Sequence, residues 1–200
     1  MRIGERDDSI KSHREMRILV LSILLSAAST VLYGQHDHAA KNTVTDTLKK
    51  SIPKEVHVQL GEAGEVHMMI NYHSPSVRGR VIWGGLVPYG DVWVTGAHSA
   101  TTWEFNQDIV INDKVVPSGK YAIFTIPGKD SWVFILNKKW DQHLADNYDA
   151  KDDVVRVNVI PTSGLNQERL KYEIVEGANS AIKLLISWEK VRVEIPFQVK

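Results

Sequence analysis

The side chains that could do chemistry gather in one stretch of the chain, residues 72–104. Five of the thirteen glycines fall between Gly79 and Gly96, and three of the six tryptophans lie close by. Glycine at this density marks tight turns or close approaches of the backbone. The candidate ligand-binding residues are His73, Arg78, Arg80, Trp83, Tyr89, Trp93, Thr95, His98 and Glu104.

The aromatic and basic side chains of this stretch suit a binding site. Trp83, Tyr89 and Trp93 could stack on a sugar ring, and Arg78 and Arg80 could hold hydroxyl groups or an anion. The stretch therefore predicts a module that binds a small ligand, either a carbohydrate or an anion. The plainer alternative is that these aromatic rings only pack, as aromatic residues beside glycine turns commonly do.

Two further functions remain open. A cell-envelope hydrolase could use His73, His98 and Glu104, provided that the fold brings the three together. A structural envelope protein would need no ligand. The sequence holds no cysteine, no Gly-x-Ser-x-Gly and no His-Glu-x-x-His, so we expect no metal and no cofactor.

Composition limits the partners. Lys plus Arg and Asp plus Glu both number 24, and 43% of the residues are hydrophobic. A neutral balance gives no reason to expect nucleic acid or a membrane surface as partner. The hydrophobic share is that of a packed globular domain. The oligomeric state is left open.

The N-terminus carries a targeting signal. An apolar run over residues 18–28 follows Arg14 and Arg17, and small residues come after it. This order predicts a signal peptide over residues 1–35, cleaved near Gly34 or after Ala28. The mixed-charge residues 1–15 are untypical of a signal, so we predict that translation begins at Met16. The run is too short to span a bilayer, which predicts a periplasmic or extracellular protein without a membrane span.

The elements that must position the candidate residues are strands. Apolar and polar residues alternate along residues 66–73, 101–106 and 191–199, and turn residues such as Asn112 and Asp113 separate the runs. This pattern predicts an all-β fold, an antiparallel sandwich resembling a jelly roll, with one long connection rich in glycine and aromatic residues. Residues 36–54 read as a flexible linker before a single domain at 55–200. Only residues 138–146 read as a short helix.

The chain also resembles a known family. The stretches that carry the resemblance are residues 71–80, 83–90, 92–97, 100–102, 118–128, 147–149, 153–157 and 188–196. They are similar to the domain of unknown function 2911 family, secreted bacterial proteins sometimes labelled asparagine synthetase B. The resemblance covers residues 54–200 and implies a secreted all-β domain without an established activity. No phosphate-binding glycine loop and no N-terminal cysteine supports the synthetase label.

Two departures from the family pattern fall among the candidate residues. Where the family commonly has Tyr-Ser-Arg-Pro, this chain has residues 72–75 with His73 and Ser74 in the middle. Where the family has Trp-Arg-Thr-Gly-Ala-Asn-Glu, residues 93–99 carry Val94, His98 and Ser99 instead of the Arg, Asn and Glu. If this strip is a site, the changes imply either an altered specificity or a degenerate site.

Overall fold

The computed structural model describes residues 50–177 and 181–200. The predicted signal peptide, and the predicted linker up to residue 49, lie outside the described residues. The first strand begins at Ile52, inside the stretch expected to be a linker. In the described part the chain forms ten strands and one short 3-10 helix. This confirms the prediction of an all-β fold.

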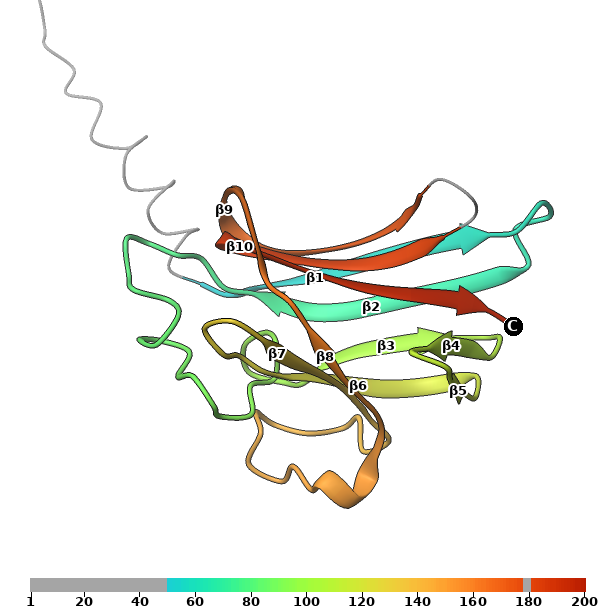
Figure 1. Ribbon diagram of the computed structural model, residues 1–200, viewed down its shortest axis with the longest axis horizontal. Coiled ribbons are helices and arrows are strands. Elements are labelled where there is room, and N and C mark those ends of the chain that lie inside the picture. The colour runs from blue at the N-terminus through green and yellow to red at the C-terminus, as the bar shows by residue number, and fades with distance from the viewer. Residues whose placement is uncertain (1–49, 178–180) are drawn as a thin grey trace, which may run out of the picture. The chain divides into compact units, whose positions relative to one another are not determined.

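Six strands form the larger sheet (Figure 1). They are β1 (Ile52–Leu60), β2 (Val66–Ser74), β3 (Thr101–Phe105), β6 (Gly119–Ile126), β7 (Trp132–Asn137) and β8 (Asp153–Val159). The order across the sheet is β1-β2-β3-β6-β7-β8, and every neighbouring pair is antiparallel. The long connection between β2 and β3, residues 75–100, is called the end segment below.

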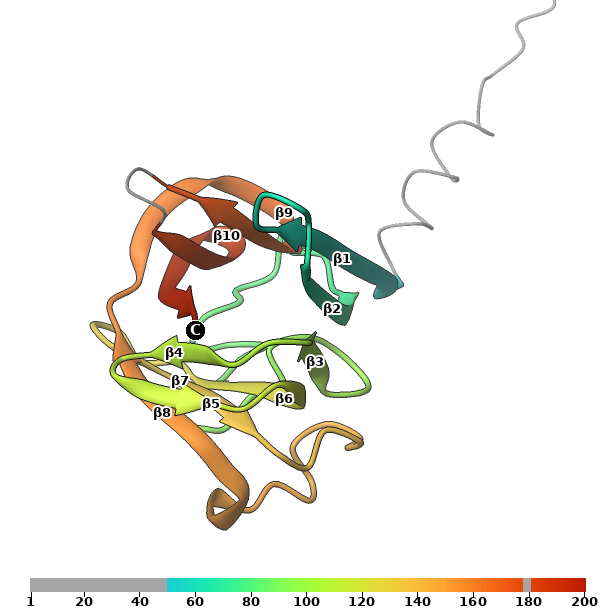
Figure 2. The ribbon, with the colours of Figure 1, turned by 90° about the vertical axis from the view of Figure 1, so that its right-hand side faces the viewer.

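Four strands form the smaller sheet, which packs against the larger one (Figure 2). They are β4 (Ile109–Ile111), β5 (Lys114–Val116), β9 (Thr162–Glu176) and β10 (Ile182–Val199), in the order β5-β4-β10-β9. These pairs are antiparallel too. The predicted antiparallel sandwich is therefore confirmed.

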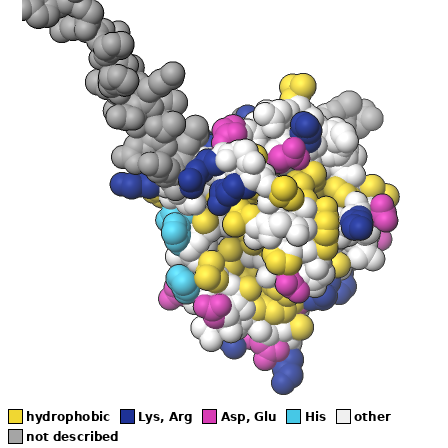
Figure 3. Space-filling view, turned by 90° about the vertical axis from the view of Figure 1, so that its left-hand side faces the viewer, with side chains coloured by type: hydrophobic (Ala, Val, Ile, Leu, Met, Phe, Trp, Pro, Cys, Tyr) yellow, Lys and Arg dark blue, Asp and Glu magenta, His cyan; other side chains and the backbone are white. Residues whose placement is uncertain are grey.

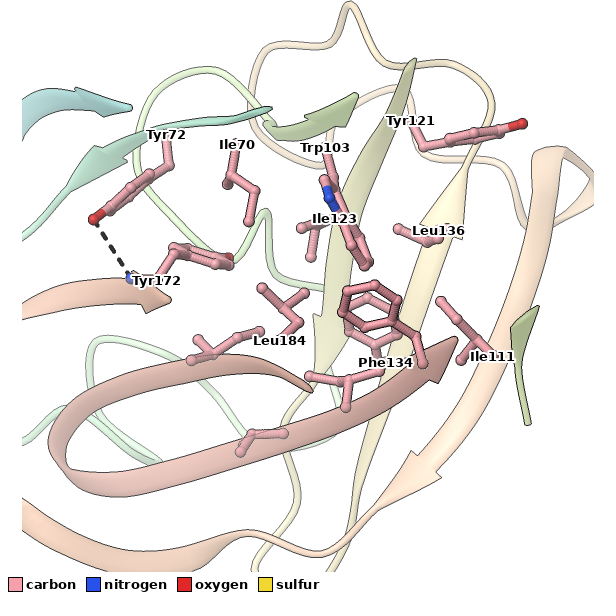
Figure 4. Packing of buried hydrophobic residues seen from close by; sticks show 14 of the residues in the cluster. Ile70, Tyr72, Trp103, Ile111, Tyr121, Ile123, Phe134, Leu136, Tyr172 and Leu184 are labelled. Carbon is pink, nitrogen blue, oxygen red and sulfur yellow. Dashed lines mark hydrogen bonds between the residues drawn. The ribbon is translucent and has the colours of Figure 1, made fainter. Parts of the chain in front are cut away.

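The core lies between the two sheets and follows the predicted alternation. Along β2 the side chains of Val66, Met68, Ile70 and Tyr72 are buried, whereas the residues between them are not. Figure 4 shows residues of β2, β3, β6 and β7 meeting Tyr172 of β9 and Leu184 of β10. Trp103 and Phe134 are fully buried there. Burying large apolar side chains of this kind stabilises each by about 1.5–3 kcal/mol.

A predicted turn joins β4 to β5. Asn112 and Asp113 occupy it with φ angles of 48° and 63°. Two successive residues with positive φ suit a tight hairpin, because the twist of such a turn matches the twist of the strands. Asn and Asp tolerate this conformation better than most residues.

The expected helix at residues 138–146 does not form; this prediction was wrong. The backbone turns irregularly there, and side chains bond the loop instead. The Asn137 Oδ1 accepts from the Lys139 amide at 2.9 Å, and the Gln142 Nε2 donates to the Lys139 carbonyl at 2.5 Å. The only helix in the described residues is the 3-10 turn η1 (Ala150–Asp152).

Loops cover part of the outer face of the larger sheet. Phe124 of β6 and Ile135 of β7 point to that face. Val94 of the end segment and Tyr148 of the loop after β7 pack on them. This second apolar cluster fixes the end segment to the sheet. No helix in residues 50–177 and 181–200 is long and apolar enough to cross a membrane.

A bulge in β10 shapes the end of the sandwich. The pairing with β9 shifts between Ser187 and Val191, and Glu189 has a φ of 55°. Bulges bend a strand and redirect its side chains. Trp188, at the bulge, is buried among the aromatic residues at the end of the core. Pro196 lies between the part of β10 that pairs with β9 and the part that pairs with β4. The N–H that proline lacks therefore removes no hydrogen bond between strands at this position.

Candidate functional site

The end segment has a strained backbone. Arg78, Thr95 and His98 all adopt positive φ, at 52°, 50° and 64°. Such angles are uncommon outside glycine, and for a β-branched residue such as threonine they are outliers. The predicted close approaches also occur: a Cβ on Gly96 would lie 2.7 Å from the Thr101 Oγ1. Strain of this kind persists only where the surroundings hold it.

Hydrogen bonds hold the strained Thr95. Its side chain is fully buried, and its Oγ1 lies 3.0 Å from the Thr125 Oγ1. Its carbonyl accepts from the Tyr172 hydroxyl at 2.7 Å and from the Thr101 Oγ1 at 3.0 Å. Thr95 therefore positions the end segment and does not offer its own side chain to a ligand.

The tryptophans of the end segment pack on one another. Trp83 and Trp93 are half-buried and meet Trp132 and Trp188, with ring centroids 4.7–5.8 Å apart. Trp93 stacks on Trp188 at an interplanar angle of 20°. The rings of Trp83 and Trp93 thus pack largely on other rings, as the plainer interpretation of the sequence expected. Tyr89 is 40% exposed and lies over Gly84.

A cavity of about 340 Å³ opens beside this cluster. Its lining includes Ser76, Arg78, Arg80, Trp93, Gly96 and His98 of the end segment, together with Trp188 of β10 and Leu144. We call it the end cavity. Figure 3 faces this end of the fold and shows an apolar area with basic and histidine side chains on one side of it and acidic side chains also on the same face. The structure therefore brings Arg78, Arg80, Trp93 and His98 to one site.

The end cavity is positively charged. Arg78, Arg80 and His98 line it, and no described Asp or Glu does. The Arg80 guanidinium donates to the carbonyls of Ser76 at 2.5 Å and Val77 at 3.1 Å, which fixes its position. Within the described part of the chain, neither guanidinium forms an ion pair. Glu168 lies near, where it accepts from the Arg78 backbone amide at 2.9 Å.

Two buried donors in the cavity wall lack a partner. The Ser76 Oγ and the Trp188 Nε1 have no hydrogen-bond partner among the described residues, and the side chains are 2% and 1% exposed. The Nε1 of Trp83, whose ring meets that of Trp188 edge to face, is also unpartnered, as is that of Trp103 in the closed core. Buried polar groups in native proteins are nearly always paired. The Ser76 Oγ and the Trp188 Nε1 are therefore the donors of this wall that an acceptor from outside the protein could satisfy.

The structure brings His73 and His98 together but leaves Glu104 apart. The two imidazole centroids are 5.2 Å apart, with the rings edge to face. Burial, and then the neighbouring His98, lowers the pKa of His73. Glu104 pairs with Met69, four residues from His73 along β2, or about 13 Å. It instead lies 3.9 Å from the Lys120 Nζ. The three groups of the predicted hydrolase do not meet.

Ser76 and Trp188 were not among the residues that the sequence singled out. Ser76 reads as part of a Ser-Pro-Ser turn, and Trp188 is far away in the sequence. One signal for Trp188 exists: the apolar alternation of residues 182–188 changes phase before Val191. Such a change indicates a bulge. In residues 50–177 and 181–200, no group of three His, Cys, Asp or Glu could hold a metal ion.

The fold and this cavity define a small antiparallel β-sandwich with a basic cavity at one end. A protein-family comparison matches residues 52–197 to a family described as a protein of unknown function, DUF2911. The chain belongs to this family, as its motifs predicted. Searches of curated proteins and of solved structures found no match.

Proposed function

We propose that the protein binds a small anionic ligand, such as an acidic carbohydrate, another carboxylate or a phosphate, in the end cavity. The single observation that carries this proposal is that buried donors without partners and basic side chains line one cavity that holds no described carboxylate. Guanidinium, imidazole, hydroxyl and indole groups can all donate to oxygen. A carboxylate or phosphate would supply the acceptors that the wall lacks.

Size and polarity support a small organic ligand. A volume of about 340 Å³ is at the lower end for ligand sites, which hold mostly apolar walls and a few placed polar groups. Leu86, Val87 and Leu144 provide the apolar wall here. The Ser76 Oγ and Trp188 Nε1 are closed to water. Ligand binding must therefore shift the wall slightly.

A thermal-shift assay with paired acids and neutral analogues tests the proposal. The acids would include uronic acids, dicarboxylates, phosphate and sulfate. A ligand at 100 times its Kd stabilises the folded protein by about 2.7 kcal/mol. For a domain of this size we expect a rise in Tm of about 5–10 °C. A panel in which no acid shifts the Tm more than its neutral analogue would refute the proposal.

Arg78→Asn is the sharpest variant. It removes the charge, and asparagine accepts the positive φ at this position. We expect loss of the acid-induced shift with little change in basal Tm. Lys129→Asn is the matched control, because it removes one exposed charge outside the cavity. Equal ligand affinity in the two variants would show that the end cavity is not the site.

We also propose that the protein is exported, with residues 1–35 removed, to the periplasm or the medium. The basic residues, apolar run and small residues of the N-terminus support this. Mass spectrometry of the protein from cell fractions tests it. We expect a chain beginning near His36 outside the cytoplasm; an uncleaved cytoplasmic chain would contradict it.

A further inference from the structure

A second cavity adjoins the end cavity on the outer face of the larger sheet. It measures about 220 Å³, and its walls come from β1, β2, β3 and the loop after β7. The residues that line it are Pro53, Lys54, Asn71, Tyr72, His73, Ser99, Ala100, Thr102, Trp140, Asp141 and Gln142. We call it the face cavity.

The two cavities share a border formed by the histidine pair. His73 lines the face cavity, His98 lines the end cavity, and their ring centroids are 5.2 Å apart. The chain also passes from one cavity to the other between His98 and Ser99. A ligand that fills the end cavity thus needs only to pass the imidazole pair to reach the second space.

The face cavity offers neutral groups that suit hydroxyls, beside one cation, Lys54, and one carboxylate, Asp141. The side chains of Asn71, Ser99 and Thr102 have no hydrogen-bond partner among the residues that the structure describes. The Gln142 Oε1 is an unpartnered acceptor that is closed to water, in a residue only 6% exposed, and the Nε2 donates to the Lys139 carbonyl. Amides and hydroxyls both donate and accept, as sugar hydroxyls do. The end cavity, by contrast, carries basic groups.

Trp140 supplies an aromatic surface beside these groups. Each of the other five tryptophans contacts another aromatic ring, whereas Trp140 contacts none in the described residues. Trp140 is 42% exposed, and the Lys120 Nζ lies over its ring, 4.3 Å from the centroid. A partly exposed indole ring beside an unpaired amide and hydroxyl groups suits a sugar ring.

We infer that the ligand is an acidic saccharide of at least two units. Its acidic unit occupies the end cavity, and the next ring passes the His73–His98 pair and lies against Trp140. This inference rests on the proposed function, since it places the acid where Arg78 and Arg80 are. It adds the substrate class and a second subsite to that proposal.

Indole N–H resonances of ¹⁵N-labelled protein can follow the two subsites separately. The probes are glucuronic acid, which fits the end cavity alone, and cellobiouronic acid, a disaccharide of glucuronic acid and neutral glucose, which can reach both. We expect the single sugar to shift the resonances of Trp93 and Trp188 only. The disaccharide should shift the Trp140 resonance as well.

Affinities measured by calorimetry on Trp140 variants complete the test. Loss of a stacked ring should weaken binding of the disaccharide about 3- to 10-fold in Trp140→Ala. Binding of the single sugar should not change, because Trp140 does not line the end cavity. Trp140→Phe keeps an aromatic ring and should recover part of the lost affinity. Arg78→Asn should weaken both sugars.

Each of the following outcomes would overturn a definite part of this inference. If the disaccharide binds no tighter than the single sugar, or Trp140→Ala weakens both equally, the second subsite is wrong and the proposed anion site stands. If an acidic peptide shifts the Trp140 resonance and the disaccharide does not, the substrate class is wrong. If neither uronic acid nor any other acid binds, the proposed function fails and this inference fails with it.

Discussion

Removing one hydroxyl, that of Tyr172, should loosen the end segment. Tyr172 of β9 is fully buried, and its hydroxyl donates to the Thr95 carbonyl at 2.7 Å (its ring lies beside Tyr72 in Figure 4). Thr95 is held at a φ of 50°, a conformation that costs about 1–3 kcal/mol. Tyr172→Phe removes one of the two bonds to this carbonyl. The Thr101 Oγ1 still donates to it, at 3.0 Å.

The expected loss is that of one net hydrogen bond. The remaining Thr101 bond keeps the carbonyl from being left without a donor, so we expect a fall of about 0.5–1.5 kcal/mol in the free energy of unfolding. In a domain of this size the Tm should fall by about 2–5 °C. Chemical denaturation with urea gives the free energy directly. Amide exchange at Trp93, whose amide bonds the Thr125 carbonyl, reports the local loosening.

Tyr121→Phe is the matched control. The Tyr121 hydroxyl donates to the Pro117 carbonyl at 2.8 Å, outside the end segment. We expect a similar fall in global stability but no faster exchange at Trp93 beyond the global change. If Tyr172→Phe is as stable as the native chain, the end segment is not held by this bond and the reasoning about strain is wrong. Equal exchange in both variants would refute the local part alone.

Two further predictions concern the same region. Gly96→Ala should lower the free energy of unfolding by about 1–3 kcal/mol, because the new Cβ would lie 2.7 Å from the Thr101 Oγ1. Gly164→Ala, whose Cβ would approach nothing closer than 3.5 Å, should change it by less than about 0.5 kcal/mol in urea denaturation, and equal losses would contradict the argument. Burial and His98 lower the pKa of His73 in the folded protein, so protonation favours the unfolded chain and stability falls as the pH drops below the unfolded value of about 6.5. The Tm of His73→Gln should therefore decline less between pH 7.5 and pH 5.5, and parallel profiles would disprove this.

The sequence predicted the strands well because their evidence is local. In β2 the alternation of Val66, Met68 and Ile70 with polar neighbours matches the two faces of the strand. The turn at Asn112 and Asp113 needs only two residues that tolerate positive φ. Such patterns depend on neighbours along the chain. They can therefore be recognised in the sequence without knowledge of the fold.

The remaining features depend on contacts between distant residues. The loop at 138–146 has a composition that tolerates a helix, but bonds from Asn137 and Gln142 hold it in another form. Tertiary contacts override weak helix propensity in such cases. The end cavity needs Trp188, which the bulge in β10 turns inward. The end-segment residues that line the cavity with Trp188 lie about ninety residues or more earlier in the chain. No local pattern reports where such a side chain will point.

The long strand β10 has a consequence for the order of folding. Its first half pairs with β9, and its end pairs with β4, joining Val199 to Ile109. The hairpin of β4 and β5 thus has no neighbour in its sheet until β10 has been synthesised and docked. Pairings so distant along the chain close slowly, since a long loop must be ordered first. The smaller sheet is therefore completed only after the last strand of the chain has been made, and its closure is the late step of folding.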